Sequence, residues 1–432
     1  MHKLLTKFSF SYDKMVMTTQ STDKPVKVCY VGCPGFPVGF AEIERIKLIS
    51  KALKKSGVDV TVLSRKGILD PHENISIAPK GVFEGIPYVI SSGTSYRPIG
   101  FFRRNLLKLK GILNEIHFLR RWAKDHTLRC LMISTMDFAD LLFYVILAKV
   151  FKFTTILNSV ELASSMTGRV TPFLRLNDYL YEKIGYRMVD GVLPISQFLF
   201  EFIGKVAPET PMLKIPVLCD MEKFQMEIAP DESDYFLFCG SVAFLEIISF
   251  ILSAFDLVFS KRNISLIFIT SGTPEEMNSL DKEIRKMQKK SLVKIYSRIP
   301  YDKLIGLYKG AIALLIPLRP SMQDKARFPH KIAEYAAAGR PIITTAEGEI
   351  PSYFTDMKTA LIAKNYDQNE FAEKMELAIQ YNGEMMKIGV AAKILAEKEF
   401  NYLNHGHRIV SFIYSIQTKE KIAMPIQENP TY

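Results

Sequence analysis

The stretch FPHKIAEYAAAGRPIITTAEGEIPSYF, residues 328–354, decides the fold. Residues 331–338 predict a helix, which Gly339 caps and Pro341 prevents from continuing. Residues 342–345 predict a buried β-strand. This helix–turn–strand unit explains almost every residue of the stretch without any function. The carboxylate of Glu334, set among small apolar residues of the helix, is not explained in this way.

Strands and helices alternate on the N-terminal side of this stretch, beginning with VKVCYVG at residues 26–32. Further strands are predicted at residues 58–64, 130–134, 154–158 and 191–195, with a helix over 41–57. The pattern restarts at residue 235, with strands at 235–240, 265–272, 293–296, 311–317 and 359–364 and helices over 244–260 and 274–290. Such alternation predicts parallel sheets with crossover helices. We therefore predict two doubly wound α/β domains with a ligand site between them.

The predicted domains have boundaries that follow this pattern. Residues 1–24 form a loose leader, 25–216 the first Rossmann-like domain and 217–395 the second. Helices follow over 396–420, and 421–432 form a tail. The longest apolar run, Ala139–Val150, is interrupted by Asp140 and is too short to span a bilayer.

Composition and charge narrow the functional classes. The chain has 432 residues, five cysteines and a net charge of +11. The cysteines are not spaced as metal ligands, so we predict no metal site and a cytoplasmic, reducing setting. The positive charge favours anionic partners such as phosphorylated ligands or a membrane face.

The positive charge is concentrated in residues 97–129, which contain nine Lys and Arg residues but only two acidic residues, Glu115 and Asp125. This segment also contains Phe101, Phe102 and the single tryptophan, Trp122. One interpretation is an amphipathic helix on an anionic membrane, at the inner face of the plasma membrane. The alternative is a helix that packs its leucines on the sheet and leaves a solvated basic face. We do not predict nucleic-acid binding, because no recognised module accompanies the charge.

The segment KIAEYAAAGRPIITTAEGEIPSYF resembles the C-terminal signature of family 4 glycosyltransferases, which have the GT-B fold. Weaker resemblance extends to residues 28–63, 190–203 and 214–224. The resemblance implies two Rossmann-like domains facing a cleft, an N-terminal acceptor domain, a C-terminal nucleotide-sugar domain and a C-terminal helix that crosses back. It also implies transfer of a sugar from a nucleoside-diphosphate sugar to a glycan or lipid-linked acceptor, with retention and without a metal. Capsule or lipopolysaccharide assembly would be a natural setting.

The same resemblance assigns Glu334 to the ribose hydroxyls of the donor, which a carboxylate can accept as a pair of hydrogen bonds. The start of its helix would offer N–H groups to the diphosphate. The family's first glutamate is absent, since Ala326 occupies its position, and Asp324 is the nearest acid. Asp324 and Glu161, which follows a strand, are the candidate catalytic residues. The remaining donor-binding candidates are the turn and loop residues Gly35, Gly39, Gly240, Gly348 and Glu349.

Cations for the donor diphosphate are missing from their usual place after the first strand of the second domain, CGSVAFLEIISF. The candidates are instead Arg319, Lys325, Arg327 and Lys331, with Lys331 and Arg327 closest to the helix start. Such cations would stabilise charge on the departing diphosphate. The alternative is a solvated basic loop.

Two other functions remain open at this stage. A non-catalytic partner of another transferase would fit the missing glutamate and the missing cation pair. A sugar-nucleotide epimerase would share the donor site and would act without an acceptor.

Overall fold

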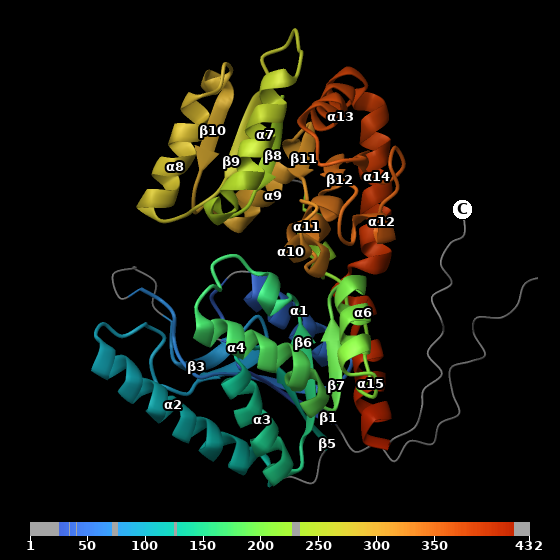
Figure 1. Ribbon diagram of the computed structural model, residues 1–432. Coiled ribbons are helices and arrows are strands. Elements are labelled where there is room, and N and C mark those ends of the chain that lie inside the picture. Colours follow the sequence, from blue (N-terminus) through green and yellow to red (C-terminus); the bar gives the residue numbers. More distant parts are fainter. Residues whose placement is uncertain are drawn as a thin grey trace, which may run out of the picture.

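The computed structural model describes residues 26–33, 35–39, 41–70, 77–124, 128–226 and 234–418. The leader predicted at 1–24 and the tail predicted at 421–432 lie outside these residues. The described chain forms two stacked units, each built on its own sheet with helices around it (Figure 1).

The first unit contains a seven-stranded sheet in the order β3-β4-β2-β1-β5-β6-β7. Its strands are β1 (Val26–Val31), β2 (Asp59–Ser64), β3 (Lys80–Phe83), β4 (Ile86–Ile90), β5 (Leu128–Ile133), β6 (Thr154–Ser159) and β7 (Gly191–Pro194). Its helices are α1 (Ala41–Lys55), α2 (Phe101–Trp122), α3 (Phe138–Phe151), α4 (Pro172–Leu180), α5 (Tyr186–Met188) and α6 (Gln197–Val206). The predicted strands are apolar runs because helices bury the parallel sheet.

One edge of this sheet was not predicted from the sequence. β3 and β4 form an antiparallel hairpin whose two loop residues, Glu84 and Gly85, have φ values of 46° and 79°. Positive φ at both positions is what a type I′ turn requires. The hairpin lacks a strong sequence signal because β3 alternates between exposed and half-buried residues.

The second unit contains a six-stranded sheet in the order β10-β9-β8-β11-β12-β13, with every pair parallel. Its strands are β8 (Tyr235–Cys239), β9 (Ser265–Ile269), β10 (Val293–Tyr296), β11 (Ala313–Ile316), β12 (Ile342–Thr345) and β13 (Leu361–Ala363). Its helices are α7 (Leu245–Leu257), α8 (Pro274–Arg285), α9 (Tyr301–Gly310), α10 (Met322–Ala326), α11 (Lys331–Ala338), α12 (Ile350–Tyr353), α13 (Gln368–Gln380) and α14 (Asn382–Glu399). Two doubly wound α/β units were therefore predicted correctly.

One helix of the second unit ends earlier than the sequence predicts. α8 stops at Arg285 instead of reaching residue 290. The carboxylate of Asp256 accepts hydrogen bonds from the backbone N–H groups of Gln288 and Lys289, each at 3.0 Å. These contacts hold the chain in a turn, because a helical N–H would instead donate within the helix.

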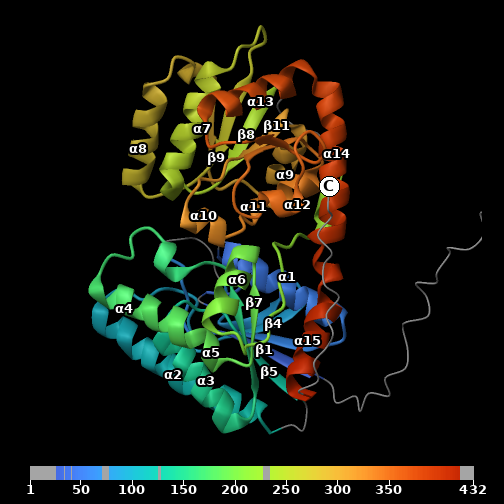
Figure 2. The same ribbon diagram turned by 45° about the vertical axis from the view of Figure 1, so that its right-hand side comes forward.

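The chain crosses between the units twice, and the two crossings lie side by side. α14 packs on α11 in the second unit, and α15 (Gly406–Thr418) packs on α1 in the first unit (Figure 2). Between these helices, Phe400 and Tyr402 form backbone hydrogen bonds of 2.7 and 3.2 Å with Cys219, in the other crossing. The predicted return of the C-terminal helices to the first domain is thus present.

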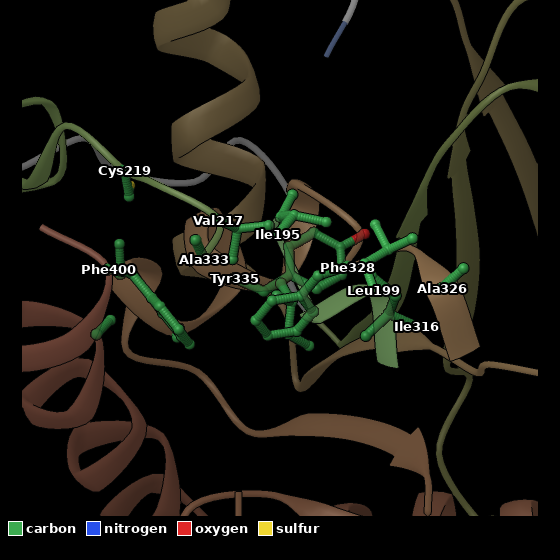
Figure 3. Close-up of a cluster of buried hydrophobic side chains, with 14 of the residues drawn as sticks. Ile195, Leu199, Val217, Cys219, Ile316, Ala326, Phe328, Ala333, Tyr335 and Phe400 are labelled. Atoms are coloured by element: carbon green, nitrogen blue, oxygen red, sulfur yellow. The ribbon is translucent and has the colours of Figure 1, made fainter. Parts of the chain in front are cut away.

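Apolar side chains connect the two units at this junction (Figure 3). Ile195 and Leu199 of the first unit belong to the same buried cluster as Phe328 and Phe400. The Phe328 and Phe400 rings are 5.8 Å apart, edge to face. The units therefore share a core, which fixes how their sheet ends face each other.

Candidate functional site

Glu334 lies in α11, facing the junction, and is 3% exposed. Its carboxylate accepts a hydrogen bond from Lys331 Nζ at 2.8 Å. The hydroxyls of Tyr301 and Tyr308 lie 3.3 and 3.4 Å from its two oxygens, and His330 Nε2 lies at 3.8 Å. The charge that looked out of place in the sequence is thus surrounded by donors.

These neighbours keep Glu334 ionised. Burial alone would raise the pKa of its carboxyl group, but the charges of Lys331 and His330, together with the hydrogen bonds from Lys331 and Tyr301, outweigh burial and lower the pKa. Burial would lower the pKa of Lys331, whereas Glu334, and to a smaller extent Glu44 of α1, raise it above the usual lysine value. Because Glu44 belongs to the first unit, this ion pair faces the junction.

The first turn of α11 is less open than the sequence suggests. The N–H groups of Ile332 and Ala333 donate to the carbonyls of Pro329 and His330, at 3.1 and 3.2 Å. The positive end of the helix dipole and the ammonium group of Lys331 remain as features that favour an anion here.

Asp324 is fully buried at the end of a network of cations. One of its oxygens accepts from the backbone N–H and Nε of Arg319 at 2.8 and 3.0 Å, and the other lies 2.7 Å from Arg327 Nη2. Arg319 also contacts Glu246 at 2.9 Å. Two of the candidate diphosphate cations are therefore paired with protein carboxylates.

The turn with Gly348 and Glu349 packs against the same network. Gly348 has φ +59°, and a Cβ there would lie 2.6 Å from the carbonyl oxygen of Asp324. Glu349 is buried and accepts from the N–H of Gln197 at 2.5 Å, while Lys214 Nζ lies at 3.4 Å. Glu349 thus connects the second unit to the start of α6 in the first.

A cavity of about 350 Å³ opens in the first unit where β1, β2, β5 and β6 end. Four carboxylates line it, those of Glu42, Asp137, Asp140 and Glu161. Glu42 belongs to α1 and Glu161 follows β6, and Ser134 Oγ donates to Glu42 Oε1 at 2.9 Å. Burial raises the pKa of the Glu42 and Glu161 carboxyl groups. Arg327 of the second unit opposes this rise at Glu161, which puts Glu161 opposite the Asp324 network. The cavity can therefore present protonatable oxygens to a polar ligand at the junction.

Glu42 was not predicted from the sequence as a site residue. It stands in the first turn of α1, directly after the glycine-rich loop, where acids are common for helix-dipole reasons alone. Its proximity to Glu161 could be recognised only once β1 and β6 were placed in one sheet.

Each of the three loop glycines lies where an added Cβ would be too close to a neighbouring side chain. Gly35 has φ +78°, and a Cβ there would lie 2.3 Å from Ile68 Cγ1; at Gly39 it would lie 2.4 Å from Ile43 Cγ1. At Gly240, which follows β8, it would lie 2.7 Å from Phe238 Cζ. Internal packing therefore accounts for these glycines without a ligand.

The described residues contain neither a metal-binding cluster nor a membrane-spanning helix. Within these ranges, no group of three or more His, Cys, Asp or Glu side chains is arranged to hold a metal ion. Among the described helices, none combines the length and apolar character needed to cross a bilayer.

Comparison with known proteins agrees with this architecture. Residues 220–394 match the family model for glycosyl transferases group 1. Sucrose-phosphate synthase from Thermosynechococcus elongatus is 15% identical, with a TM-score of 0.70 over 91% of this chain and 100% of that chain. The chain has the GT-B fold.

Two other GT-B structures are similar over comparable lengths. HepE from Anabaena, in complex with UDP and glucose, is 13% identical, with a TM-score of 0.66 over 90% of this chain and 99% of that one. The lipopolysaccharide outer core galactosyltransferase WaaB is 15% identical, with a TM-score of 0.58 over 90% and 99% of the two chains. No curated protein sequence matches the chain.

Proposed function

We propose that this GT-B protein is a glycosyltransferase that takes its sugar from a nucleoside-diphosphate sugar. The observation that carries the proposal is the ion pair between buried Glu334 and half-buried Lys331 at the start of α11, within the segment that matches glycosyl transferases group 1. A carboxylate and an ammonium group 2.8 Å apart offer complementary partners for a ribose diol and a phosphate. HepE, which shares the fold, was solved with UDP and with UDP-glucose.

In the proposed reaction, Glu334 exchanges its tyrosine hydrogen bonds for those of the ribose hydroxyls, and Lys331 turns toward the diphosphate. The bond between the anomeric carbon and the phosphate oxygen breaks, and the acceptor hydroxyl forms the new bond on the same face of the sugar. The departing phosphate takes the acceptor's proton, so the proposed reaction retains configuration without a metal. Glu161 then faces the reacting sugar from the first unit, and Asp324 acts from the second unit by holding Arg319 and Arg327 in place.

The proposed acceptor is a glycan or lipid-linked sugar in surface polysaccharide assembly. α2 supports a membrane location: Phe101, Phe102 and Leu106 are 68%, 87% and 68% exposed beside its basic residues. Along α2, only Gly111, Glu115 and Leu119 are buried, which favours the interfacial over the fully packed interpretation of this helix. A Phe101→Ser/Phe102→Ser variant should co-sediment less with anionic vesicles than a control such as Val390→Ser, a 53% exposed residue of α14. Equal sedimentation would contradict membrane contact through α2.

The main test is a thermal-shift screen of UDP-, GDP-, ADP- and CMP-sugars. We expect one donor to stabilise the protein and Glu334→Gln, which retains the side-chain volume, to bind it about 10- to 100-fold more weakly. This range corresponds to losing charge-assisted hydrogen bonds worth roughly 1.5–3 kcal/mol. Glu373→Gln removes the same charge from an exposed position of α13 and should bind normally. Equal donor affinity in both variants would refute the role of Glu334.

A non-catalytic GT-B partner protein is the second candidate, and the pairing of Arg319 and Arg327 with Asp324 favours it. Cations held by a buried carboxylate are less available to a donor diphosphate. Donor hydrolysis or sugar transfer by the purified protein would exclude this candidate.

A further inference from the structure

A second cavity, of about 530 Å³, lies in the first unit between α2 and the segments that follow β2 and β4. Its lining comprises Lys66, Gly67, Ile68, Ser92, Thr94, Tyr96, Arg97, Pro98, Phe101, Arg104, Asn105, Leu107 and Lys108. The described lining therefore contains basic residues but no aspartate or glutamate.

The four cations of this cavity are Lys66, Arg97, Arg104 and Lys108, and none of them forms an ion pair with a described residue. Arg104 and Lys108 are one helical turn apart, so both side chains lie on the same face of α2. Like charges collected around one hollow repel one another, and an anion placed among them relieves this repulsion. By contrast, Arg65 in the loop before Lys66 is held by Glu115 and Asp140.

This cationic cavity adjoins the cavity that is lined by Glu42, Asp137, Asp140 and Glu161. Lys66 and Lys108 line both of them. A ligand with its anion among the four cations can therefore extend past Lys66 toward Glu42 and Glu161, at the ends of the strands. The chemistry along this path changes from cationic to hydrogen-bonding, as a phosphate followed by a sugar would require.

The segment that borders the cationic cavity carries exposed apolar side chains, of which Phe101 lines the cavity itself. Ile99, Phe101 and Leu106 are each 68% exposed, and Phe102 is 87% exposed. A hydrocarbon chain attached to a phosphate in the cavity would leave it past Phe101, toward these exposed side chains.

We propose that the cavity bounded by Lys66, Arg97, Arg104 and Lys108 binds a phosphate or diphosphate group on the acceptor. The inference rests on the proposed glycosyltransferase function and defines its acceptor class as a phosphorylated glycan or lipid. The anion holds the acceptor at one end, and its sugar hydroxyl reaches the junction at the other.

The test uses inorganic pyrophosphate as the probe and the full chain as the protein. Isothermal titration calorimetry should show pyrophosphate binding that is about tenfold weaker in Arg97→Ala/Arg104→Ala, equivalent to ~1.4 kcal/mol. Arg120→Ala/Arg121→Ala removes the same charge from exposed positions on the same helix, outside the cavity, and should bind as the wild type does. Equal binding by both variants, or no binding by the wild type, would overturn the proposal.

A second arm distinguishes a lipid headgroup from a soluble phosphate. Vesicles of phosphatidylcholine that contain a polyprenyl diphosphate are compared with vesicles that contain phosphatidylglycerol at equal charge. A lipid acceptor predicts that Arg97→Ala/Arg104→Ala loses binding to the diphosphate vesicles in particular. A soluble acceptor predicts that the variant loses pyrophosphate affinity while neither vesicle type is preferred. The nucleotide-sugar screen is independent of both arms, so failure of the donor proposal would be seen separately.

Discussion

Replacement of Asp324 tests whether this residue holds the second unit together or contacts the donor sugar. The side chain is fully buried and ion-paired with Arg319 and Arg327. Removing one partner of a buried ion pair typically costs 3–5 kcal/mol, because the remaining charge is left without compensation. Arg319 would still be paired with Glu246, which lies 2.9 Å from it. We therefore expect Asp324→Ala to lower the free energy of unfolding by about 3 kcal/mol, at the lower end of this range.

The Asp324→Asn variant is the matched control. It retains the side-chain volume and an oxygen that can accept a hydrogen bond from the backbone N–H of Arg319. We therefore expect a smaller loss in the free energy of unfolding, about 1–2 kcal/mol. Unfolding should be followed in urea by far-UV circular dichroism, because the only tryptophan, Trp122, is in the first unit. Hydrogen exchange of residues 318–328 would show whether the loss is local to this network.

The pH dependence of stability gives an independent measure of the same network. Burial opposes ionisation of Asp324, but hydrogen bonds from Arg319 and the charge of Arg327 outweigh it and lower its pKa. A lowered folded-state pKa contributes stability above the unfolded-state value of about 3.9, and this stability is lost as the pH falls below it. The wild type should therefore lose more stability than Asp324→Asn between about pH 4 and the folded-state pKa.

One result would refute this reasoning. If Asp324→Ala unfolds at the wild-type urea concentration but no longer transfers or hydrolyses the donor sugar, the carboxylate is a catalytic group and its ion pairs contribute little to stability.

Two further predictions concern pH and backbone geometry. Burial lowers the pKa of His405 to about 4, and its ring lies 3.0 Å from Arg408 and 2.9 Å from a backbone carbonyl. Because the unfolded state binds a proton at higher pH than the folded state, the free energy of unfolding should fall by up to about 3 kcal/mol from pH 6.5 to 4. In urea titrations, His405→Asn should flatten this pH profile. A steeper profile in the variant would contradict the assignment. Gly348→Ala combines positive φ with a contact of 2.6 Å to the carbonyl oxygen of Asp324 and should lower the free energy of unfolding by roughly 2 kcal/mol. Gly57→Ala, with φ +83° and no atom within 4 Å of its Cβ, should cost only about 1 kcal/mol, and equal losses would show that the contact is unimportant.

The sequence by itself determined the alternation of strands and helices. Residues 26–32 and 235–240 are recognisable as strands because a sheet covered on both faces requires unbroken apolar runs. The end of α11 follows from Gly339, which adopts φ +72°, and from Pro341. These signals are local, since each depends on neighbours within a few residues, and together they lead to two doubly wound units.

Only the tertiary structure decided which charged groups meet. The spacing of Asp324 and Arg327, and of Lys331 and Glu334, permits local pairs, but nothing in the sequence shows that Arg319 also meets Glu246 or that Glu349 meets Lys214 of the first unit. Ion pairing depends on approach to within a few ångströms, and residues far apart in the chain make that approach once the sheet order is set. For the same reason, Glu42 lies near Glu161, because β1, β5 and β6 are neighbours in one sheet. Arg104 and Lys108 of α2 share a cavity with Lys66 and Arg97 because β2 and β4 are neighbours in that sheet.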